Sequence, residues 1–200
     1  MEKKVRPLVM IHGLWNNPRI FNRLSSKLIR RFDAPLFVPH LNHDFGRKNL
    51  NDLAANLDVY IASTLSQYKY LDILGFSMGG LIGRIWIQSL GGFERTKRFI
   101  TVGTPHKGTF TAQLIPNCLL AGIADMKRNS LLVRQLNNDT SKLENIECKS
   151  FYCKSDLMVF PGWDAIMPFG SNYDLPVLTH RQLIQDPNAV NLLLKEIIDF

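Results

Sequence analysis

Short, continuous apolar runs alternate along the chain with longer segments in which apolar residues recur every three or four positions. A continuous run bounded by proline or glycine is typical of a strand buried on both faces, whereas the wider spacing is typical of a helix with one buried face. The runs predict strands at residues 8–11, 36–38, 71–74, 99–102, 150–153 and 176–178. The spaced segments predict helices over residues 18–32, 50–65, 81–90 and 190–198.

Strands and helices alternate over the 200 residues without an internal repeat or an obvious linker. This order favours a single α/β domain over residues 1–200, in which helices cover both faces of a mostly parallel sheet. Residues 108–145 interrupt the alternation, because they contain helical patches but no clear strand. We expect a short helical insertion there, which either packs on the body of the protein or forms a small lid over a site.

A serine stands between the strand predicted at 71–74 and the helix predicted at 81–90, in the sequence Gly75-Phe76-Ser77-Met78-Gly79. The pattern Gly-x-Ser-x-Gly is a weak signal by itself, because about one chain in fifteen of this length meets it by chance. Its place between a buried strand and a buried helix is the setting in which a tight turn holds a serine hydroxyl above the sheet edge. We therefore predict that Ser77 is a nucleophile.

A serine nucleophile needs a general base. In proteins with this strand–turn–helix arrangement, the acid of the triad follows the serine in the chain, and the histidine follows the acid. Only His106 and His180 lie downstream of Ser77. Few carboxylates precede His106, whereas several precede His180, so His180 is the predicted base. Asp156 follows the strand at 150–153 and is the predicted acid. Its competitors are Asp164, which is the most serious, and Asp125, Asp139 and Asp174.

Acyl transfer also requires hydrogen-bond donors for the developing oxyanion. The backbone N–H of Met78 is one candidate, and that of Leu14, in the loop after the first strand, is the other. In the same loop, we expect the ring of His12 to form hydrogen bonds that fix the loop's shape. Trp15 and Trp163 are candidates for binding substrate, although tryptophan at such positions is often part of the core.

Several segments together resemble one family: His12-Gly13-Leu14, the serine turn at residues 75–80, Gly-Thr-Pro-His-Lys-Gly at residues 103–108, Asp156 and His180. The combination resembles the small lipase and esterase branch of the α/β-hydrolases, in particular small lipases of the cyanobacterial and plastid type. The resemblance runs from the first strand to His180. It implies an α/β-hydrolase fold with a triad of Ser77, His180 and Asp156, and oxyanion donors at Leu14 and Met78.

The resemblance implies a carboxylic ester hydrolase that acts on lipid or other acyl esters through an acyl-enzyme. An acyltransferase or a thioesterase would use the same triad, so the residues alone do not separate these activities. A non-catalytic binding protein with this fold is a further alternative, but such proteins typically lose a triad member.

The charge and composition of the chain limit the classes of molecule that it is expected to bind. The formal net charge is +7, with Lys and Arg spread along the chain; this indicates either a solvated basic surface or a weak attraction to anionic headgroups or acidic substrates. The sequence has no motif for nucleic-acid binding. We expect a small acyl ester or lipid as substrate and at most a peripheral contact with a membrane. No oligomeric state is predicted.

The positions of the cysteines and histidines argue against structural disulfide bonds and against a metal-binding site. Cys118, Cys148 and Cys153 are too few for a disulfide framework, which favours a reducing compartment. There is no N-terminal signal pattern and no apolar run long enough to span a membrane, so we expect a cytoplasmic protein. His40 and His43, with Asp44, are more typical of a solvated loop than of a metal site. We expect no metal and no organic cofactor.

Overall fold

The structure is a computed structural model that describes residues 6–31, 33–116 and 119–198. Six strands form one sheet in the order β2-β1-β3-β4-β5-β6, and every neighbouring pair is parallel. The strands are β1 (Leu8–Ile11), β2 (Leu36–Phe37), β3 (Leu71–Phe76), β4 (Thr96–Val102), β5 (Glu147–Tyr152) and β6 (Ser171–Asp174). The predicted parallel sheet is confirmed.

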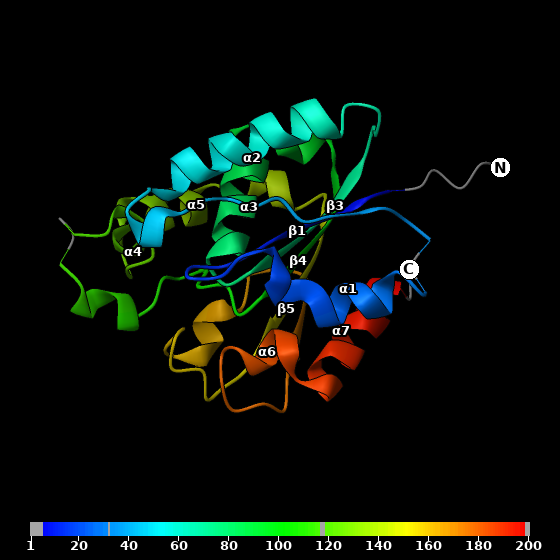
Figure 1. Cartoon of the computed structure of the whole chain (residues 1–200). Helices are drawn as coiled ribbons and strands as arrows, with labels where there is room; N and C mark the ends of the chain where they lie inside the picture. The colour runs from blue at the N-terminus through cyan, green and yellow to red at the C-terminus, as the bar shows by residue number, and fades with distance from the viewer. Residues whose placement is uncertain (1–5, 32, 117–118, 199–200) are drawn as a thin grey trace.

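Helices cover both faces of this sheet (Figure 1). One face carries α2 (Leu50–Thr64) and α3 (Met78–Ser89), and the other carries α1 (Asn22–Leu28), α6 (Gln182–Gln185) and α7 (Pro187–Ile198). Short 3-10 helices occur at η1 (Pro18–Phe21), η2 (Asp44–Gly46), η3 (Gly92–Glu94) and η6 (Gly162–Ala165).

Strand β3 shows how the sheet separates two hydrophobic cores. All six of its residues are buried. Ile73 belongs to the core under α2 and α3, whereas Leu74 and Phe76 belong to the core under α1, α6 and α7. Successive side chains of a strand point to opposite faces, so a strand covered on both sides is mostly apolar. This explains why β1 and most of β3 appear in the sequence as apolar runs. The exception in β3 is Asp72, which is buried and pairs with Arg98 at 2.6 Å.

The ends of several elements differ from the prediction. The strand predicted at 176–178 is wrong, because the sixth strand is the polar segment Ser171–Asp174, which pairs with β5 at the sheet edge. The helix predicted over 18–32 begins as η1, and α1 ends at Leu28; residue 32 lies outside the described residues. Helix α3 begins at Met78, directly after the serine, rather than at residue 81.

Residues 108–145 form helical segments and, in the part that the structure describes, no strand. They comprise η4 (Thr111–Leu114), α4 (Ala121–Asp125), α5 (Leu131–Asn138) and η5 (Ser141–Leu143). Figure 1 shows α4 and α5, in green, at one end of the molecule. Buried Arg84 of α3 attaches α5 to the sheet domain, since its Nη2 donates to the carbonyl oxygen of Leu136 at 2.7 Å and its Nη1 donates to the Asn137 side chain at 3.0 Å.

Within the described ranges, no helix combines the length and the apolar character that crossing a membrane requires. The two described cysteines, Cys148 and Cys153, are buried free thiols, and Cys118 lies outside the described residues.

Candidate active site

Ser77 occupies a tight turn between β3 and α3. Its backbone has φ 55° and ψ −126°, a conformation that residues with a β-carbon rarely adopt. Two backbone hydrogen bonds hold the turn: the Ser77 N–H donates to Val102 O at 2.8 Å, and the Gly80 N–H donates to Ser77 O at 3.0 Å. Ser77 is partly exposed, whereas its neighbours Phe76 and Met78 are buried. The turn therefore presents the serine hydroxyl at the carboxyl edge of the sheet.

The loop after β1 passes directly beside the serine. A β-carbon on Gly13 would lie 2.8 Å from the Cβ and 3.4 Å from the Oγ of Ser77, so only glycine fits there without a shift. The backbone N–H of Leu14 follows this contact. Met78 is the first residue of α3, and the first N–H groups of a helix have no acceptor within it. Both predicted oxyanion donors are thus backbone groups next to Ser77.

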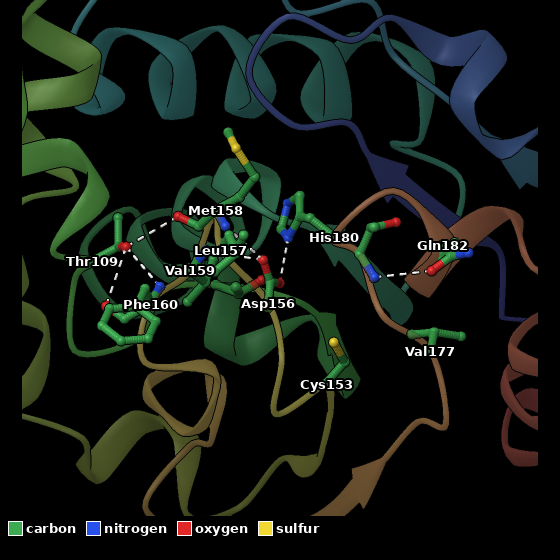
Figure 2. Close-up of polar contacts among 12 residues, drawn as sticks. Thr109, Cys153, Asp156, Leu157, Met158, Val159, Phe160, Val177, His180 and Gln182 are labelled. Atoms are coloured by element: carbon green, nitrogen blue, oxygen red, sulfur yellow. Dashed lines mark hydrogen bonds and ion pairs between the residues drawn. The ribbon is translucent and has the colours of Figure 1, made fainter.

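His180 is hydrogen-bonded to Asp156. The distance from His180 Nδ1 to Asp156 Oδ2 is 2.6 Å, and Figure 2 shows the carboxylate lying between the imidazole and the loop that follows it. The other carboxylate oxygen accepts the backbone N–H groups of Met158 at 2.8 Å and Val159 at 3.1 Å. Asp156 is 1% exposed. A carboxylate only accepts hydrogen bonds, so Nδ1 carries a proton, and in the neutral form of the imidazole Nε2 then presents a lone pair.

Three further contacts fix the imidazole. It stacks on the ring of Phe76 with the centroids 4.9 Å apart. A β-carbon on Gly103, whose φ is +57°, would lie 2.9 Å from the His180 Cε1. The loop before the histidine is tied by the side chain of Gln182, whose Oε1 accepts the backbone N–H groups of Leu178 and Thr179 at 2.9 Å each.

The loop that carries Asp156 is tied to the start of the insertion. Thr109 Oγ1 donates to the carbonyl oxygen of Met158 at 3.0 Å and accepts the Phe160 N–H at 2.9 Å (Figure 2). The Thr111 hydroxyl donates to Leu157 O at 2.7 Å. The acid loop and the first residues of the insertion therefore form one hydrogen-bonded unit.

The Nε2 atom of His180 is buried and forms no hydrogen bond to any described residue, Ser77 included. Its side chain is 12% exposed, and His180 and Ser77 line the same cavity. A buried, unpaired acceptor beside a serine hydroxyl can take the serine proton when a substrate closes the geometry.

The other candidates for base and acid are engaged elsewhere. His106 is buried between Thr101 Oγ1, 3.0 Å from its Nε2, and Arg84, and burial lowers its pKa well below the ordinary value. Among the competing carboxylates, Asp164 faces Arg128, and burial raises its pKa. The remaining three accept hydrogen bonds or ion pairs from partners other than His180: Asp125 from Leu50, Asp139 from Ser141 and Asp174 from Lys154.

His12 has the role in the loop that the sequence predicts. Its Nε2 accepts the backbone N–H of Leu41 at 3.1 Å, and its Nδ1 lies 3.1 Å from Gly13 O. Burial, with smaller contributions from His43 and His40, lowers its pKa to about 4, so the ring is neutral and the Nδ1 proton points to Gly13 O. Within the described residues, no group of three or more His, Cys, Asp or Glu side chains is suited to hold a metal ion.

Ser77 and His180 open into a cavity of about 480 Å³. The insertion and the acid loop supply most of its apolar wall: Ala112, Ile115, Ile123, Met126, Met158 and Val159. Trp15 lines the cavity, and its role in binding substrate stays a prediction. Trp163 does not line it, which corrects the expectation for this residue. Its neighbours in η6, Gly162 and Asp164, face inward, and this leaves the indole ring pointing outward and 56% exposed.

Sequence reasoning missed the polar side of the cavity, which is lined by Asn16, Asn17, Arg19, Arg181 and Gln185. One signal was present in the sequence: Arg181 follows the predicted base directly, and Gln185 lies one helical turn further on. For Arg19 and the two asparagines we find no sequence signal beyond their position a few residues after the predicted oxyanion loop.

The fold and the arrangement of the site define the class, an α/β-hydrolase of the lipase and esterase type. The chain belongs to the palmitoyl protein thioesterase family, whose profile matches residues 7–156. The match includes Ser77 and Asp156 and ends before His180. Among curated proteins, no significant sequence match was found.

Solved structures share the fold at low sequence identity. Lipase B of Aspergillus fumigatus superposes with a TM-score of 0.78 and 16% identity over 100% of this chain and 54% of the lipase, so the chain spans about half of that protein. The mature lipase BlEst2 of Bacillus licheniformis gives 0.73 and 16%, over 98% of this chain and 93% of the lipase. A lipase-esterase related protein of Clostridium acetobutylicum gives 0.67 and 15%, over 100% and 96%. These likenesses concern the fold.

Proposed function

We propose that this protein is a serine hydrolase of carboxylic esters or thioesters, with Ser77 as nucleophile, His180 as general base and Asp156 as the group that orients His180. One observation carries the proposal: His180 donates from Nδ1 to buried Asp156 at 2.6 Å, while its unpaired Nε2 shares a cavity with Ser77. This is the division of labour that a serine triad requires.

The reaction follows from these groups. Ser77 Oγ attacks the acyl carbon, and its proton passes to His180 Nε2. The N–H groups of Met78 and Leu14 stabilise the oxyanion. The carbon–oxygen or carbon–sulfur bond then breaks, and the leaving group takes the proton from His180. A water molecule, activated in the same way, releases the acid from the acyl-enzyme.

The family profile favours thioesters as one substrate class, because the matching family is named palmitoyl protein thioesterase. The fold relatives named as lipases support oxygen esters. Both share the first half-reaction, so we keep both bond types within the proposal. Acyl transfer to an alcohol differs only in the final acceptor, and product analysis in the presence of lipid alcohols tests it.

We propose that residues 108–145 form a small cover over the acyl side of the cavity, within a single domain. Ala112, Ile115, Ile123 and Met126 support this role, because they face the cavity that contains Ser77. Apolar walls of this kind bind acyl chains by removing them from water.

We place the enzyme in a reducing compartment, in keeping with the free thiols of Cys148 and Cys153. A peripheral contact with a membrane is supported by exposed apolar side chains that border the cavity, Trp15 and Met158 among them.

The test is labelling with a fluorophosphonate together with hydrolysis of a soluble acyl ester and a soluble acyl thioester. Wild-type protein should be labelled at Ser77 and should hydrolyse at least one substrate, and Ser77→Ala should lose both properties. Asp156→Asn should keep the fold and lower kcat by about a thousandfold or more, because the imidazole loses its orienting partner. Asp174→Asn is the matched control, since Asp174 pairs with Lys154 on the surface. Absence of Ser77 labelling in the folded wild-type protein would overturn the proposal.

A further inference from the structure

The cavity beside Ser77 carries an uncompensated positive charge. Of the Arg, Lys, Asp and Glu side chains in the described part of the chain, only Arg19 and Arg181 line it. Both residues are exposed at the cavity. Among the described residues, neither guanidinium forms an ion pair with a carboxylate. Both charged side chains that line the cavity are therefore cationic, which favours an anionic group beside them.

The two arginines come from elements other than those that supply most of the apolar wall. Arg19 belongs to η1, and Arg181 directly precedes α6; these two elements are in contact. Figure 1 shows α6, in orange, well apart from α4 and α5 of the insertion. Asn16, Asn17 and Gln185 line the arginine side, so it is polar as well as charged.

Arg181 is held in place by a neutral partner. Its Nε donates to the Gln185 side chain at 2.8 Å, which orients the guanidinium and leaves its terminal nitrogens available. The nearby carboxylate of Asp186 accepts the backbone N–H groups of Asn188 at 2.8 Å and Ala189 at 3.1 Å, which fixes it at the start of α7.

The proton transfer to the leaving group indicates which part of a substrate lies beside the two arginines. In a serine hydrolase the leaving atom must come close to the base, because the base returns the proton to it. His180 is that base in the proposed function, and Arg181 is the next residue along the chain. The apolar wall suits the acyl chain, so the charged side faces the leaving group. A pair of guanidinium groups matches the geometry and charge of a phosphate.

We propose that Arg19 and Arg181 form a subsite for a phosphate on the leaving group, so that the substrate is an acyl ester or thioester of a phosphate-bearing alcohol or thiol. This inference rests on the proposed hydrolase activity. The same chemistry has two sources, a phosphorylated glycerol headgroup and a phosphorylated thiol carrier, and substrate pairs separate them.

The experiment uses two matched pairs with a hexanoyl chain, which keeps all four substrates soluble. The first pair is 1-hexanoylglycerol 3-phosphate and 1-hexanoylglycerol. The second pair is hexanoyl-coenzyme A and S-hexanoyl-N-acetylcysteamine. Within at least one pair, the full-length wild-type protein should show a kcat/KM about tenfold or more higher for the phosphorylated member, and added salt should reduce this ratio.

Arg19→Gln and Arg181→Gln should each lower that ratio by about five- to tenfold, because each removes one charged donor from the phosphate. Using the ratio cancels any general effect of Arg181→Gln on its neighbour His180. Arg30→Gln is the matched control, because Arg30 is exposed and does not line the cavity, and the substitution removes the same charge. It should leave the ratio unchanged.

The outcomes separate the two claims. If Ser77 is labelled but the phosphorylated members are cleaved no faster than their neutral partners, or not at all, the subsite is wrong and the proposed function stands. The subsite is also wrong if both arginine variants keep the wild-type ratio. If Ser77 is not labelled and none of the four substrates is cleaved, the proposed function itself is wrong.

Discussion

Gly13 and Ser77 touch across the site: a β-carbon on Gly13 would lie 2.8 Å from the Ser77 Cβ. Gly13 lies in the loop after β1 and Ser77 directly follows β3, and these two strands pair directly in the sheet. The contact therefore couples the loop that carries Leu14, a proposed oxyanion donor, to the proposed nucleophile.

Gly13→Ala should lower kcat by about a hundredfold, because a displacement of about 1 Å between nucleophile and oxyanion donors costs this much. Steady-state hydrolysis of a soluble ester and the rate of Ser77 labelling measure the effect. Gly91→Ala is the control: its φ is +83° and no atom lies within 4 Å of the added carbon. It should cost about 1 kcal/mol of stability and no activity. Wild-type kinetics in Gly13→Ala would show that the contact does not position the site.

Ala112→Trp should shorten the acyl chains that the enzyme accepts. Ala112 is buried and faces the cavity from the insertion, so a larger side chain there takes space from the acyl group. We expect kcat/KM to fall by about tenfold for a palmitoyl substrate and by less than about threefold for a butyryl substrate. Leu114→Trp is the control, since Leu114 is 85% exposed in the same short helix, η4, and does not line the cavity. An equal fall on both chain lengths would contradict the acyl role of this wall.

Arg84→Met should destabilise the protein by about 2 to 4 kcal/mol. Arg84 is fully buried, and its guanidinium donates to Gln88, Leu136 and Asn137. The substitution removes these three hydrogen bonds and leaves the buried side-chain oxygen of Gln88 without a donor. Urea unfolding measures the loss, and amide exchange should show α5 opening more readily than β3. Arg134→Met, at an exposed position of α5, should change stability by less than about 0.5 kcal/mol. Equal stability of the two variants would contradict the anchoring role.

Acid should weaken the fold through His12. Burial lowers its pKa from 6.5 to about 4, so between these values the unfolded chain binds a proton that the folded chain excludes. The stability present above pH 6.5 is therefore lost as the pH falls toward 4, and the shift corresponds to about 3 kcal/mol. His106, whose pKa is also lowered by burial, acts in the same direction.

Urea unfolding between pH 7 and pH 4 tests this prediction. The free energy of unfolding of wild-type protein should fall with pH more steeply than that of His12→Asn, which has no imidazole to protonate at this position. Parallel curves for the two proteins would show that His12 does not carry the acid sensitivity.

The central strands could be predicted from the sequence because burial on both faces leaves an unbroken apolar signature. Strand β1, Leu8–Ile11, is the clearest case, and the apolar residues of β3 placed Ser77 at the end of that strand. The edge strand β6 could not be found in this way. It has one neighbour and largely exposed side chains, so its sequence, Ser171–Asp174, has no apolar run. The apolar run that follows it is a loop in which Val177 is buried and Leu178 is 73% exposed.

The predicted Ser77, Asp156 and His180 lie together in the fold because each follows a strand of one parallel sheet, and chain order limits the choices. The polar side of the cavity was not predictable in the same way. Arg19 and Arg181 stand far apart in the sequence, and they line one cavity because η1 packs on α6. Trp163 shows the reverse error: it is close in sequence to Asp156, but the short helix that carries it turns the ring outward.

In the proposed mechanism, activity depends on the part of the chain that follows Asp156. The family profile ends at Asp156, whereas His180, the proposed base, follows β6 at the edge of the sheet. A nascent or cleaved chain that stops at Asp156 would contain the nucleophile, its turn and the acid, but no proton acceptor. In the proposed mechanism, hydrolysis thus depends on the last fifth of the sequence, so a copy that stops at Asp156 would not cleave acyl esters or thioesters.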